Sequence, residues 1–294
     1  MKPNNQNKNL LLLGSTGLLG SSLSQYLKIS GYNFYTHSLT NVGDYNVDLT
    51  NFHEVNELIK KTKPRIILNL VALTDVDLCE REPNKSYLLN VRTVENIVAA
   101  IKKSAPECHL IHISTDQVYD GNGLNIESNI CLRNYYSYSK YASELTALNV
   151  SSTILRTNFF GRSLCKRRLS FTDWIFNSLL DKKSIEVFND ILFSPLSIAS
   201  LTRMIELCIE KKPVGIYNLG SSSSMSKADF AKIFASKCGL STNLLKSVSI
   251  SNVDFLNAYR PRDMRLNCAL FEKKINIKLP SLIDEIEHVV KEYV

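Results

Sequence analysis

The stretch Gly14-Ser15-Thr16-Gly17-Leu18-Leu19-Gly20 decides the fold of this chain. It follows an apolar run, residues 9–13, that suits a buried parallel strand, and residues 18–29 carry apolar side chains near helical spacing. Glycines with this spacing at the first strand-to-helix turn indicate a loop that binds the pyrophosphate of a dinucleotide. Gly14 permits the tight turn, Gly17 lets the backbone approach the phosphates, and Gly20 allows the helix to pack closely on the strand. Free N–H groups at the start of the helix favour the phosphate charge.

Strand and helix signals alternate through the first half of the chain. We expect further strands at residues 33–36, 66–71, 109–114 and 153–156, and helices at residues 54–61, 84–103 and 136–147. This alternation predicts an α/β fold of the Rossmann type, a doubly wound parallel sheet with helices on both faces. We assign residues 1–160 to an NAD(P)-binding domain. The regularity weakens afterwards, so we expect residues 161–294 to form a smaller, mixed C-terminal substrate lobe that packs partly back on the sheet.

The composition is that of a globular protein. Of 294 residues, 44% are hydrophobic and 21% are charged, which excludes the disordered and fibrous classes. The apolar runs are too short to cross a bilayer, and residues 1–9 lack the apolar stretch of a secretory signal. Seven cysteines without a C-x-x-C pair indicate reduced thiols, so we expect a cytoplasmic protein.

The charge balance is mildly basic, with 35 basic and 28 acidic residues and a net charge of +7. We expect no nucleic-acid partner, because no basic stripe or reader motif accompanies this charge. Only residues 162–168, R-S-L-C-K-R-R, are densely basic. Two interpretations of this run remain open, a solvated loop or a loop that meets an anionic small molecule.

A second pattern concerns proton transfer. Tyr136 and Lys140 are four residues apart in an expected helix and therefore share one of its faces. A nearby lysine lowers the pKa of a tyrosine hydroxyl, which then exchanges a proton more readily near neutral pH. Thr115 follows the strand at residues 109–114, and strand ends of such a sheet face the ligand crevice. Its hydroxyl can therefore bond a substrate carbonyl beside Tyr136.

The residues after the second strand bear on the cofactor. NAD-specific sites place Asp or Glu there for the ribose, but this chain has Thr36-His37-Ser38. No carboxylate repels a 2′-phosphate, and His37 and Ser38 could donate to it. NADP(H) is therefore favoured, and NAD(H) stays open. Asp48, followed by Leu49, either holds the adenine amine or is an acid at a helix N-terminus.

Further motifs point to a known family. They are Asn69-Leu70-Val71-Ala72-Leu73-Thr74-Asp75-Val76-Asp77, Leu89-Asn90, Ser114-Thr115-Asp116-Gln117-Val118-Tyr119-Asp120-Gly121, Leu155-Arg156-Thr157, Arg260-Pro261 and Arg265-Leu266-Asn267. With these motifs, nearly the whole chain resembles the extended short-chain dehydrogenase/reductase family. Within it, the chain is most similar to the dTDP-4-dehydrorhamnose reductases and related nucleotide-sugar reductases. The resemblance implies reduction of the keto group of a nucleotide-linked 4-keto-6-deoxy sugar, with a nicotinamide as hydride donor and Tyr136 as proton donor.

The matching motifs also imply site residues. The catalytic set would be Thr115, Tyr136 and Lys140. Together with His37 and Ser38 at the end of the second strand, these motifs give the expected cofactor-binding residues. They are Gly14, Ser15, Thr16, Gly17, Leu18, Leu19, His37, Ser38, Asp48, Leu49, Ala72, Thr74, Tyr136 and Lys140. The residues expected to bind the sugar nucleotide are Thr74, Val76, Gln117, Phe159 and Arg260. No metal site is expected, because the five histidines form no cluster with ligand spacing.

The chain departs from the rhamnose-forming pattern within the expected sugar pocket. Gln117 stands where those enzymes commonly have Tyr, and Phe159 stands where they often have Trp. Residues 190–195 match their motif only in part. The cofactor and the chemistry therefore carry over better than the identity of the sugar.

Two other functions remain open. An epimerase would use the same residues with a tightly held cofactor, and a non-catalytic NADP-binding protein would resemble the regulatory subunit of methionine adenosyltransferase. Dehydration is disfavoured, because the amide Gln117 follows Asp116 where nucleotide-sugar dehydratases usually carry Glu. The expected partner is a nucleotide sugar, and we expect no membrane partner. A homodimer is compatible with the sequence.

Overall fold

The computed structural model describes residues 9–39 and 42–294, and its centre is a sheet of six strands. The strands lie in the order β2-β1-β3-β4-β5-β10, and every neighbouring pair is parallel. Their bounds are β1 (Leu10–Leu13), β2 (Phe34–His37), β3 (Ile66–Asn69), β4 (His109–Thr115), β5 (Ser152–Thr157) and β10 (Gly215–Leu219). The predicted Rossmann-type parallel sheet is confirmed. Strands β2 and β3 flank β1, so the switch point where such sheets bind ligands lies between β1 and β3.

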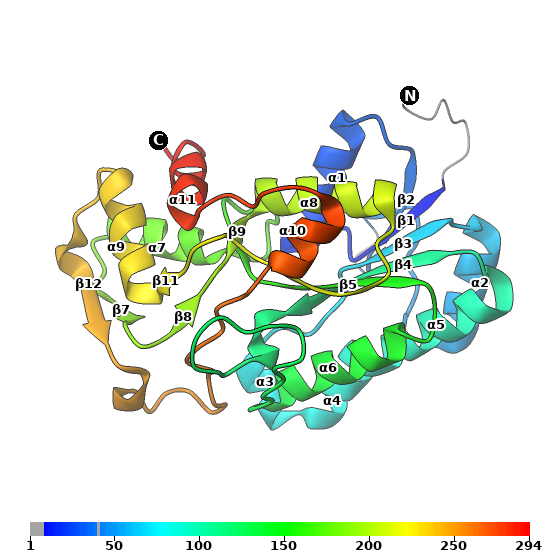
Figure 1. Ribbon diagram of the computed structural model, residues 1–294, viewed down its shortest axis with the longest axis horizontal. Helices are drawn as coiled ribbons and strands as arrows, with labels where there is room; N and C mark the ends of the chain where they lie inside the picture. The colour runs from blue at the N-terminus through cyan, green and yellow to red at the C-terminus, as the bar shows by residue number, and fades with distance from the viewer. Residues whose placement is uncertain (1–8, 40–41) are drawn as a thin grey trace.

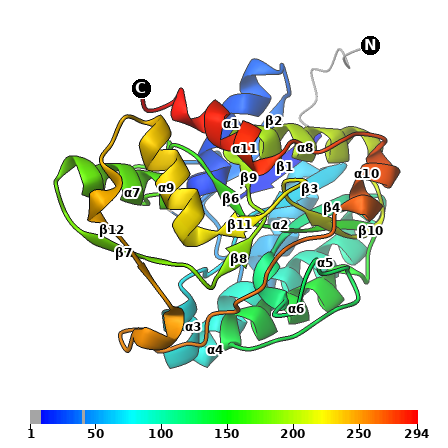
Figure 2. The ribbon, with the colours of Figure 1, turned by 60° about the vertical axis from the view of Figure 1, so that its left-hand side comes forward.

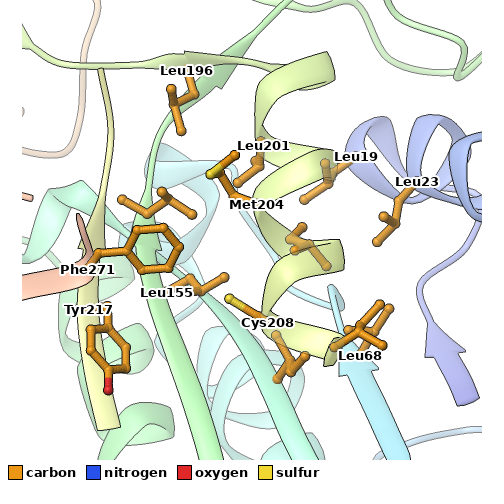
Figure 3. Packing of buried hydrophobic residues seen from close by; sticks show 14 of the residues in the cluster. Leu19, Leu23, Leu68, Leu155, Leu196, Leu201, Met204, Cys208, Tyr217 and Phe271 are labelled. Carbon is orange, nitrogen blue, oxygen red and sulfur yellow. The ribbon is translucent and has the colours of Figure 1, made fainter. Parts of the chain in front are cut away.

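Helices cover both faces of the sheet (Figure 1). Helices α1 (Leu18–Ile29) and α8 (Ile198–Lys211) lie on one face, and α2 (Phe52–Thr62), α5 (Thr93–Ser104) and α6 (Tyr135–Ala147) lie on the other. The four leucines of β1 are all buried and alternate between these two hydrophobic clusters, as the side chains of a strand must. On the first face, Leu19 and Leu23 of α1 point towards α8, which contributes Leu201, Met204 and Cys208 (Figure 3). This packing fixes the start of α1 against the sheet.

The long helix predicted at residues 84–103 is interrupted. The structure has α4 (Pro83–Tyr87), a π-helical turn η1 (Leu88–Arg92) and then α5. Asn90 lies in the π-helical turn, where its Oδ1 accepts from the Leu73 N–H at 2.7 Å and its Nδ2 donates to Ser139 Oγ at 2.8 Å. The wider turn lets this side chain hold a loop and a second helix together, which apolar periodicity does not reveal.

A second hydrophobic core lies in the C-terminal half, away from the six-stranded sheet (Figure 2). It is built by α7 (Phe171–Leu180), α9 (Lys227–Lys237), α11 (Leu282–Val290) and the parallel pair β7 (Ile185–Phe188) and β12 (Leu245–Val248). Each of these three helices begins at a serine whose side chain accepts from a backbone N–H: Ser170, Ser226 and Ser281. The remaining elements are α3 (Val76–Arg81), η2 (Asp116–Val118), β6 (Phe159–Phe160), β8 (Leu192–Phe193), β9 (Leu196–Ser197), β11 (Met225–Ser226), η3 (Thr242–Leu244), η4 (Ile250–Asn252) and α10 (Ala269–Ile275).

All seven cysteines carry free thiols. Among residues 9–39 and 42–294, no helix has both the length and the apolar character needed to span a membrane. Within the same residues, no group of three or more His, Cys, Asp or Glu side chains is arranged to hold a metal ion.

Candidate active site

A pocket of about 490 Å³ lies at the carboxyl ends of the sheet strands. Its walls include residues that end or follow five strands in turn: Gly14, His37, Leu70, Thr115 and Asn158. The pocket is therefore located where doubly wound sheets bind their ligands. Most residues expected at the site line it, namely Gly14, Thr16, Gly17, Leu18, Leu19, His37, Ser38, Asp48, Leu49, Ala72, Thr74, Thr115, Gln117, Tyr136, Lys140 and Phe159.

The glycine loop has the geometry that its spacing predicts. Gly14 adopts φ +83°, a left-handed conformation that favours glycine. A Cβ on Gly20 would lie 2.1 Å from the carbonyl oxygen of Gly14, so no larger residue fits there without moving backbone. Helix α1 starts after Gly17 with no side-chain cap and no acidic residue in its first turn. Its first N–H groups are therefore suited to an anion, and the loop fits a dinucleotide pyrophosphate.

Ser15 differs from its neighbours because it does not line the pocket. Its backbone N–H and its hydroxyl both donate to the carbonyl of His37, at 3.0 Å each. The Gly14 N–H donates to the same carbonyl at 3.1 Å. Ser15 thus ties the glycine loop to the end of β2, so its side chain is a structural anchor in this arrangement.

The side chain of His37 is buried, and its Nε2 lies 2.8 Å from the carbonyl oxygen of Val47. Among the described residues its Nδ1 has no hydrogen-bond partner. Burial lowers the pKa of His37, and the contact with Val47 only partly opposes this shift. A neutral ring that donates from Nε2 offers only an acceptor at Nδ1. His37 would therefore donate to a phosphate only in its protonated form.

Asp48 lines the pocket with Leu49, on the same side as His37. Its Oδ1 accepts from the backbone N–H of Thr50 at 2.9 Å and from the Thr50 hydroxyl at 2.8 Å. The cap of helix α2 is Asn51, whose side chain accepts from two backbone N–H groups of the first turn. Of the two interpretations of Asp48, the helix-capping one is therefore wrong, since Asn51 fills that position.

The three expected catalytic residues meet in the pocket. Thr115 ends β4, and its hydroxyl lies close enough to Tyr136, at the start of α6, to influence the pKa of that tyrosine. Burial raises the pKa of Tyr136, whereas Thr115 and the charge of Arg168 lower it. Asn134 caps α6 by accepting from the Ser137 N–H at 2.8 Å, which holds Tyr136 in the first helical turn.

Lys140 lies one turn after Tyr136 and is 1% exposed. Its Nζ donates to the carbonyl of Ile113 at 2.8 Å and lies 3.5 Å from Nε2 of His112. Burial lowers the pKa of Lys140 to about 8, and the charge of Glu144 opposes that shift. The ammonium of this pocket residue is thus held against strand β4.

Asp116 is a pocket residue that sequence reasoning did not include. Its carboxylate accepts from Asn158 Nδ2 at 2.7 Å and from the Thr115 hydroxyl at 3.3 Å. Burial raises the pKa of Asp116 to about 6, although the Asn158 contact lowers it. The signal was its position directly after Thr115. Only the fold brings Asn158, which is also in the pocket wall, next to it.

Arg168 is a second residue outside the expected set. Its guanidinium donates to the hydroxyl of Thr74, and both residues line the pocket. The neighbouring Lys166 and Arg167 are exposed and are not part of the pocket wall. One residue of the basic run at 162–168 therefore reaches the site, which favours the anionic-ligand interpretation for Arg168 and the solvated-loop interpretation for its neighbours.

Two expected sugar-binding residues, Val76 and Arg260, are not part of the pocket wall. Val76 is buried at the start of α3, where it packs with Cys79 and Tyr136. Arg260 forms a salt bridge with Asp77 at 2.7 Å and also donates to the carbonyl of Ala258 at 2.8 Å. These contacts join α3 to the segment at residues 258–260, outside the pocket wall.

Comparison with known proteins identifies the family. Residues 8–294 match the family described as the RmlD substrate binding domain. The chain belongs to this family. A dTDP-4-dehydrorhamnose reductase of Escherichia coli is 30% identical over 295 residues, which cover 92% of this chain and 93% of the relative. A crystal structure of dTDP-4-dehydrorhamnose reductase from Bacillus anthracis in complex with NADP has a TM-score of 0.88 at 26% identity, covering 98% of this chain and 100% of that chain.

The fold extends beyond the RmlD family. A UDP-glucose 4-epimerase of Thermotoga maritima has a TM-score of 0.80 at 18% identity, covering 96% of this chain and 97% of that chain. At this identity the likeness shows the fold alone. Fold therefore does not separate a reductase from an epimerase, and the assignment of a reaction depends on the site.

Proposed function

We propose that this RmlD-family chain is an NAD(P)H-dependent reductase of a nucleotide-linked 4-keto-6-deoxy sugar, with the activity of a dTDP-4-dehydrorhamnose reductase. One observation carries the proposal. Thr115 and Tyr136 lie close together in the wall of the pocket that the glycine loop also lines, in a chain 30% identical to the Escherichia coli reductase.

The glycine loop and the start of α1 would hold the pyrophosphate of the dinucleotide, and Asp48 and Leu49 would flank its adenine. When bound, the dinucleotide supplies the hydride. We favour NADP(H), because the relative from Bacillus anthracis binds NADP and because His37, Ser38 and Leu39, in the wall after β2, carry no carboxylate. NAD(H) is the second choice.

The side chains at the reacting end have distinct roles in this proposal. Thr115 orients the keto oxygen through its hydroxyl, and Tyr136 gives its phenolic proton to that oxygen as negative charge develops. The buried ammonium of Lys140 stabilises the phenolate that remains. Gln117, Phe159 and Thr74 line the part of the pocket assigned to the sugar, and Arg168 offers a guanidinium to the anionic nucleotide.

In this proposal the two halves of the chain bind different ligands. Residues 1–160 would bind the cofactor, and residues 161–294 would contribute mainly to the nucleotide sugar. Arg168, which hydrogen-bonds to Thr74, is a pocket residue of the second half. We further propose a cytoplasmic location, which the seven free thiols support. Sedimentation of the purified protein tests the expected homodimer.

Oxidation of NADPH in the presence of dTDP-4-keto-6-deoxy sugars tests the function. Stoichiometric loss of NADPH absorbance with formation of a 6-deoxy sugar is the expected result. Isomerised sugar without NADPH consumption would show an epimerase instead. Cofactor binding without any change in the sugar would show a non-catalytic binding protein.

A further inference from the structure

Three buried side chains follow one another along one face of α6. Tyr136, Lys140 and Glu144 are spaced by four residues, so each lies one turn beyond the previous one. Their exposed fractions are 7%, 1% and 0%. Tyr136 and Lys140 belong to the proposed reaction, whereas Glu144 lies too deep to meet a substrate and has no assigned role.

Glu144 joins α6 to two strands of the sheet. Arg156 on β5 donates from Nη2 to Glu144 Oε2 at 2.6 Å and from Nε to Oε1 at 3.0 Å. Ser114 on β4 donates its hydroxyl to Oε1. Because Ser114 directly precedes Thr115, the carboxylate of Glu144 fixes the strand end that carries one catalytic hydroxyl and the helix that carries the other.

The other nitrogen of the Arg156 guanidinium also has hydrogen-bond partners, so the buried network around Glu144 extends beyond this ion pair. Arg156 Nη1 donates to the hydroxyl of Tyr119 at 2.7 Å and to the carbonyl of Glu127 at 2.6 Å. Tyr119 in turn donates to Asn218 on β10 at 2.7 Å. A buried carboxylate with this many donors is held in one position, which gives its charge a fixed location relative to Lys140.

Lys140 needs an anion nearby to stay charged. Among the described residues no carboxylate forms an ion pair with it, and its two contacts are the Ile113 carbonyl and Nε2 of His112. His112 faces it from β4 and is neutral, because burial and the charge of Lys140 hold the pKa of His112 well below its usual range. Tyr136 lies on the preceding turn, and Glu144 on the following turn is the group whose charge favours protonated Lys140.

We propose, building on the proposed reductase function, that Glu144 is a positioning residue of the site. Its carboxylate keeps the buried ammonium of Lys140 charged, and its contacts hold the β4 end with Thr115 against Tyr136. In a merely structural network the charge of Glu144 would serve only as the counterion of Arg156, and the titration of Lys140 would not depend on it. The two roles therefore separate in variants that alter the charge and the contacts independently.

The closing experiment measures kcat against pH for three variants. Glu144→Gln keeps the shape and removes the charge, Glu144→Asp keeps the charge, and Ser114→Ala removes one contact while the charge stays. We expect the alkaline limb of kcat, where Lys140 loses its proton, to move about one pH unit lower in Glu144→Gln, as loss of one nearby opposite charge predicts. Glu144→Asp should restore the wild-type limb, and Ser114→Ala should reduce kcat equally at every pH.

A second measurement needs neither sugar nor cofactor. The folded-state pKa of Lys140, about 8, is below its ordinary value of 10.5, so the free energy of unfolding rises with pH between these values. In Glu144→Gln this rise should begin about one pH unit lower, which denaturant unfolding at closely spaced pH values detects. If wild-type protein reduces no keto sugar, the proposed function fails, but this measurement still decides the role of Glu144.

An unchanged alkaline limb together with an unchanged onset of the stability rise would overturn the proposal and leave Glu144 a structural residue. If Glu144→Gln does not fold, because Arg156 is left without its anion, the double variant Glu144→Gln/Arg156→Gln removes both buried charges together. Loss of the Arg156 charge by itself raises the pKa of Lys140, so the double variant is compared with Arg156→Gln and not with the wild type. Its alkaline limb should lie about one pH unit below that of Arg156→Gln, and coincident limbs would overturn the proposal.

Discussion

The guanidinium of Arg168 hydrogen-bonds to the hydroxyl of Thr74 across the pocket, although 94 residues separate the two in the chain. Arg168 also lies close enough to Tyr136 for its charge to lower the pKa of that tyrosine. Lys140 and Arg168 are the lysine and arginine side chains of the described pocket wall, and Lys140 is engaged with a backbone carbonyl. Arg168 is thus the cation available to an anionic ligand at the reacting end.

Replacement of Arg168 should weaken binding of the sugar nucleotide. A hydrogen bond to a charged group contributes about 1.5–3 kcal/mol, so we expect Arg168→Ala to raise KM for the nucleotide sugar about tenfold or more. The dissociation constant of NADPH should stay near wild type. Arg167→Ala is the matched control, since Arg167 is exposed on the same loop outside the pocket. Equal effects of the two substitutions would show that Arg168 acts only through the overall charge of the loop.

Tyr136→Phe should abolish the proton donor and keep the ring in its packing with Val76 and Cys79. Folding and NADPH binding should survive, whereas kcat should fall at least about 100-fold, the usual contribution of a general acid. Thermal unfolding and cofactor titration serve as controls alongside the kinetics. Turnover at the wild-type rate would remove Tyr136 from the mechanism.

Asp116 should give the protein a pH-dependent stability. Its folded-state pKa, about 6, is above the ordinary value of 3.8, so the folded protein binds the proton more tightly than the unfolded chain. The contribution of this group to the free energy of unfolding is therefore present below about pH 4 and is lost as pH rises through 6, with a slope of at most about 1.4 kcal/mol per pH unit. Asp116→Asn should flatten the pH dependence between these values. Urea unfolding at several pH values compares the two proteins, and parallel curves would contradict the prediction.

Gly17 and Gly20 should respond differently to alanine. In Gly20→Ala the new methyl group meets the Gly14 carbonyl at 2.1 Å, so we expect a loss of about 1–3 kcal/mol of stability, as in other overpacked sites. A methyl group on Gly17 meets its nearest neighbour at 3.4 Å, so Gly17→Ala should fold normally and lose NADPH affinity instead. Denaturant unfolding and cofactor titration separate the two effects. Normal NADPH affinity in Gly17→Ala would show that the pyrophosphate does not approach this residue.

Gln117 should influence the choice of sugar. Its side chain lines the pocket, and its Oε1 accepts from Asn134 Nδ2 at 3.4 Å, which leaves the amide nitrogen for a ligand hydroxyl. Gln117→Ala should change the ratio of kcat/KM between two epimeric 4-keto sugars and leave NADPH affinity unchanged, because a site that bonds a specific hydroxyl discriminates against its absence. The same ratio in both proteins would mean that Gln117 does not contact the sugar.

The parts of the molecule that sequence predicts well are those set by local chemistry. The glycine loop and the strand before it depend on a short run of residues, and the parallel sheet follows from the order of such runs. Thr115, Tyr136 and Lys140 meet because a strand end and a helix start are brought to the same edge of that sheet. The π-helical turn has no such local signature, because its residue Asn90 bonds to a loop 17 residues away.

The sequence does not predict the roles of side chains that depend on a hydrogen-bond or ion-pair partner far away in the chain. Ser15 turns to the carbonyl of His37, and Arg260 pairs with Asp77, which is 183 residues away. Arg168 could not be chosen over Lys166 and Arg167 from a run of similar charges, because only the folded loop brings one of them to Thr74. In each of these cases the hydrogen-bond partner is set by contacts between distant parts of the chain and not by the residue type.

The position of β10 at the edge of the sheet has a consequence for synthesis on the ribosome. Strand β5 pairs with β10, and α8 covers one face of the sheet, so both neighbours are translated after residue 197. A nascent chain that has emerged only as far as β5 therefore exposes an unpaired strand edge and an apolar face that α1 covers only in part, the kinds of surface through which incomplete chains aggregate. Although the glycine loop is among the first segments to be made, its sheet is complete only after three-quarters of the chain has been translated.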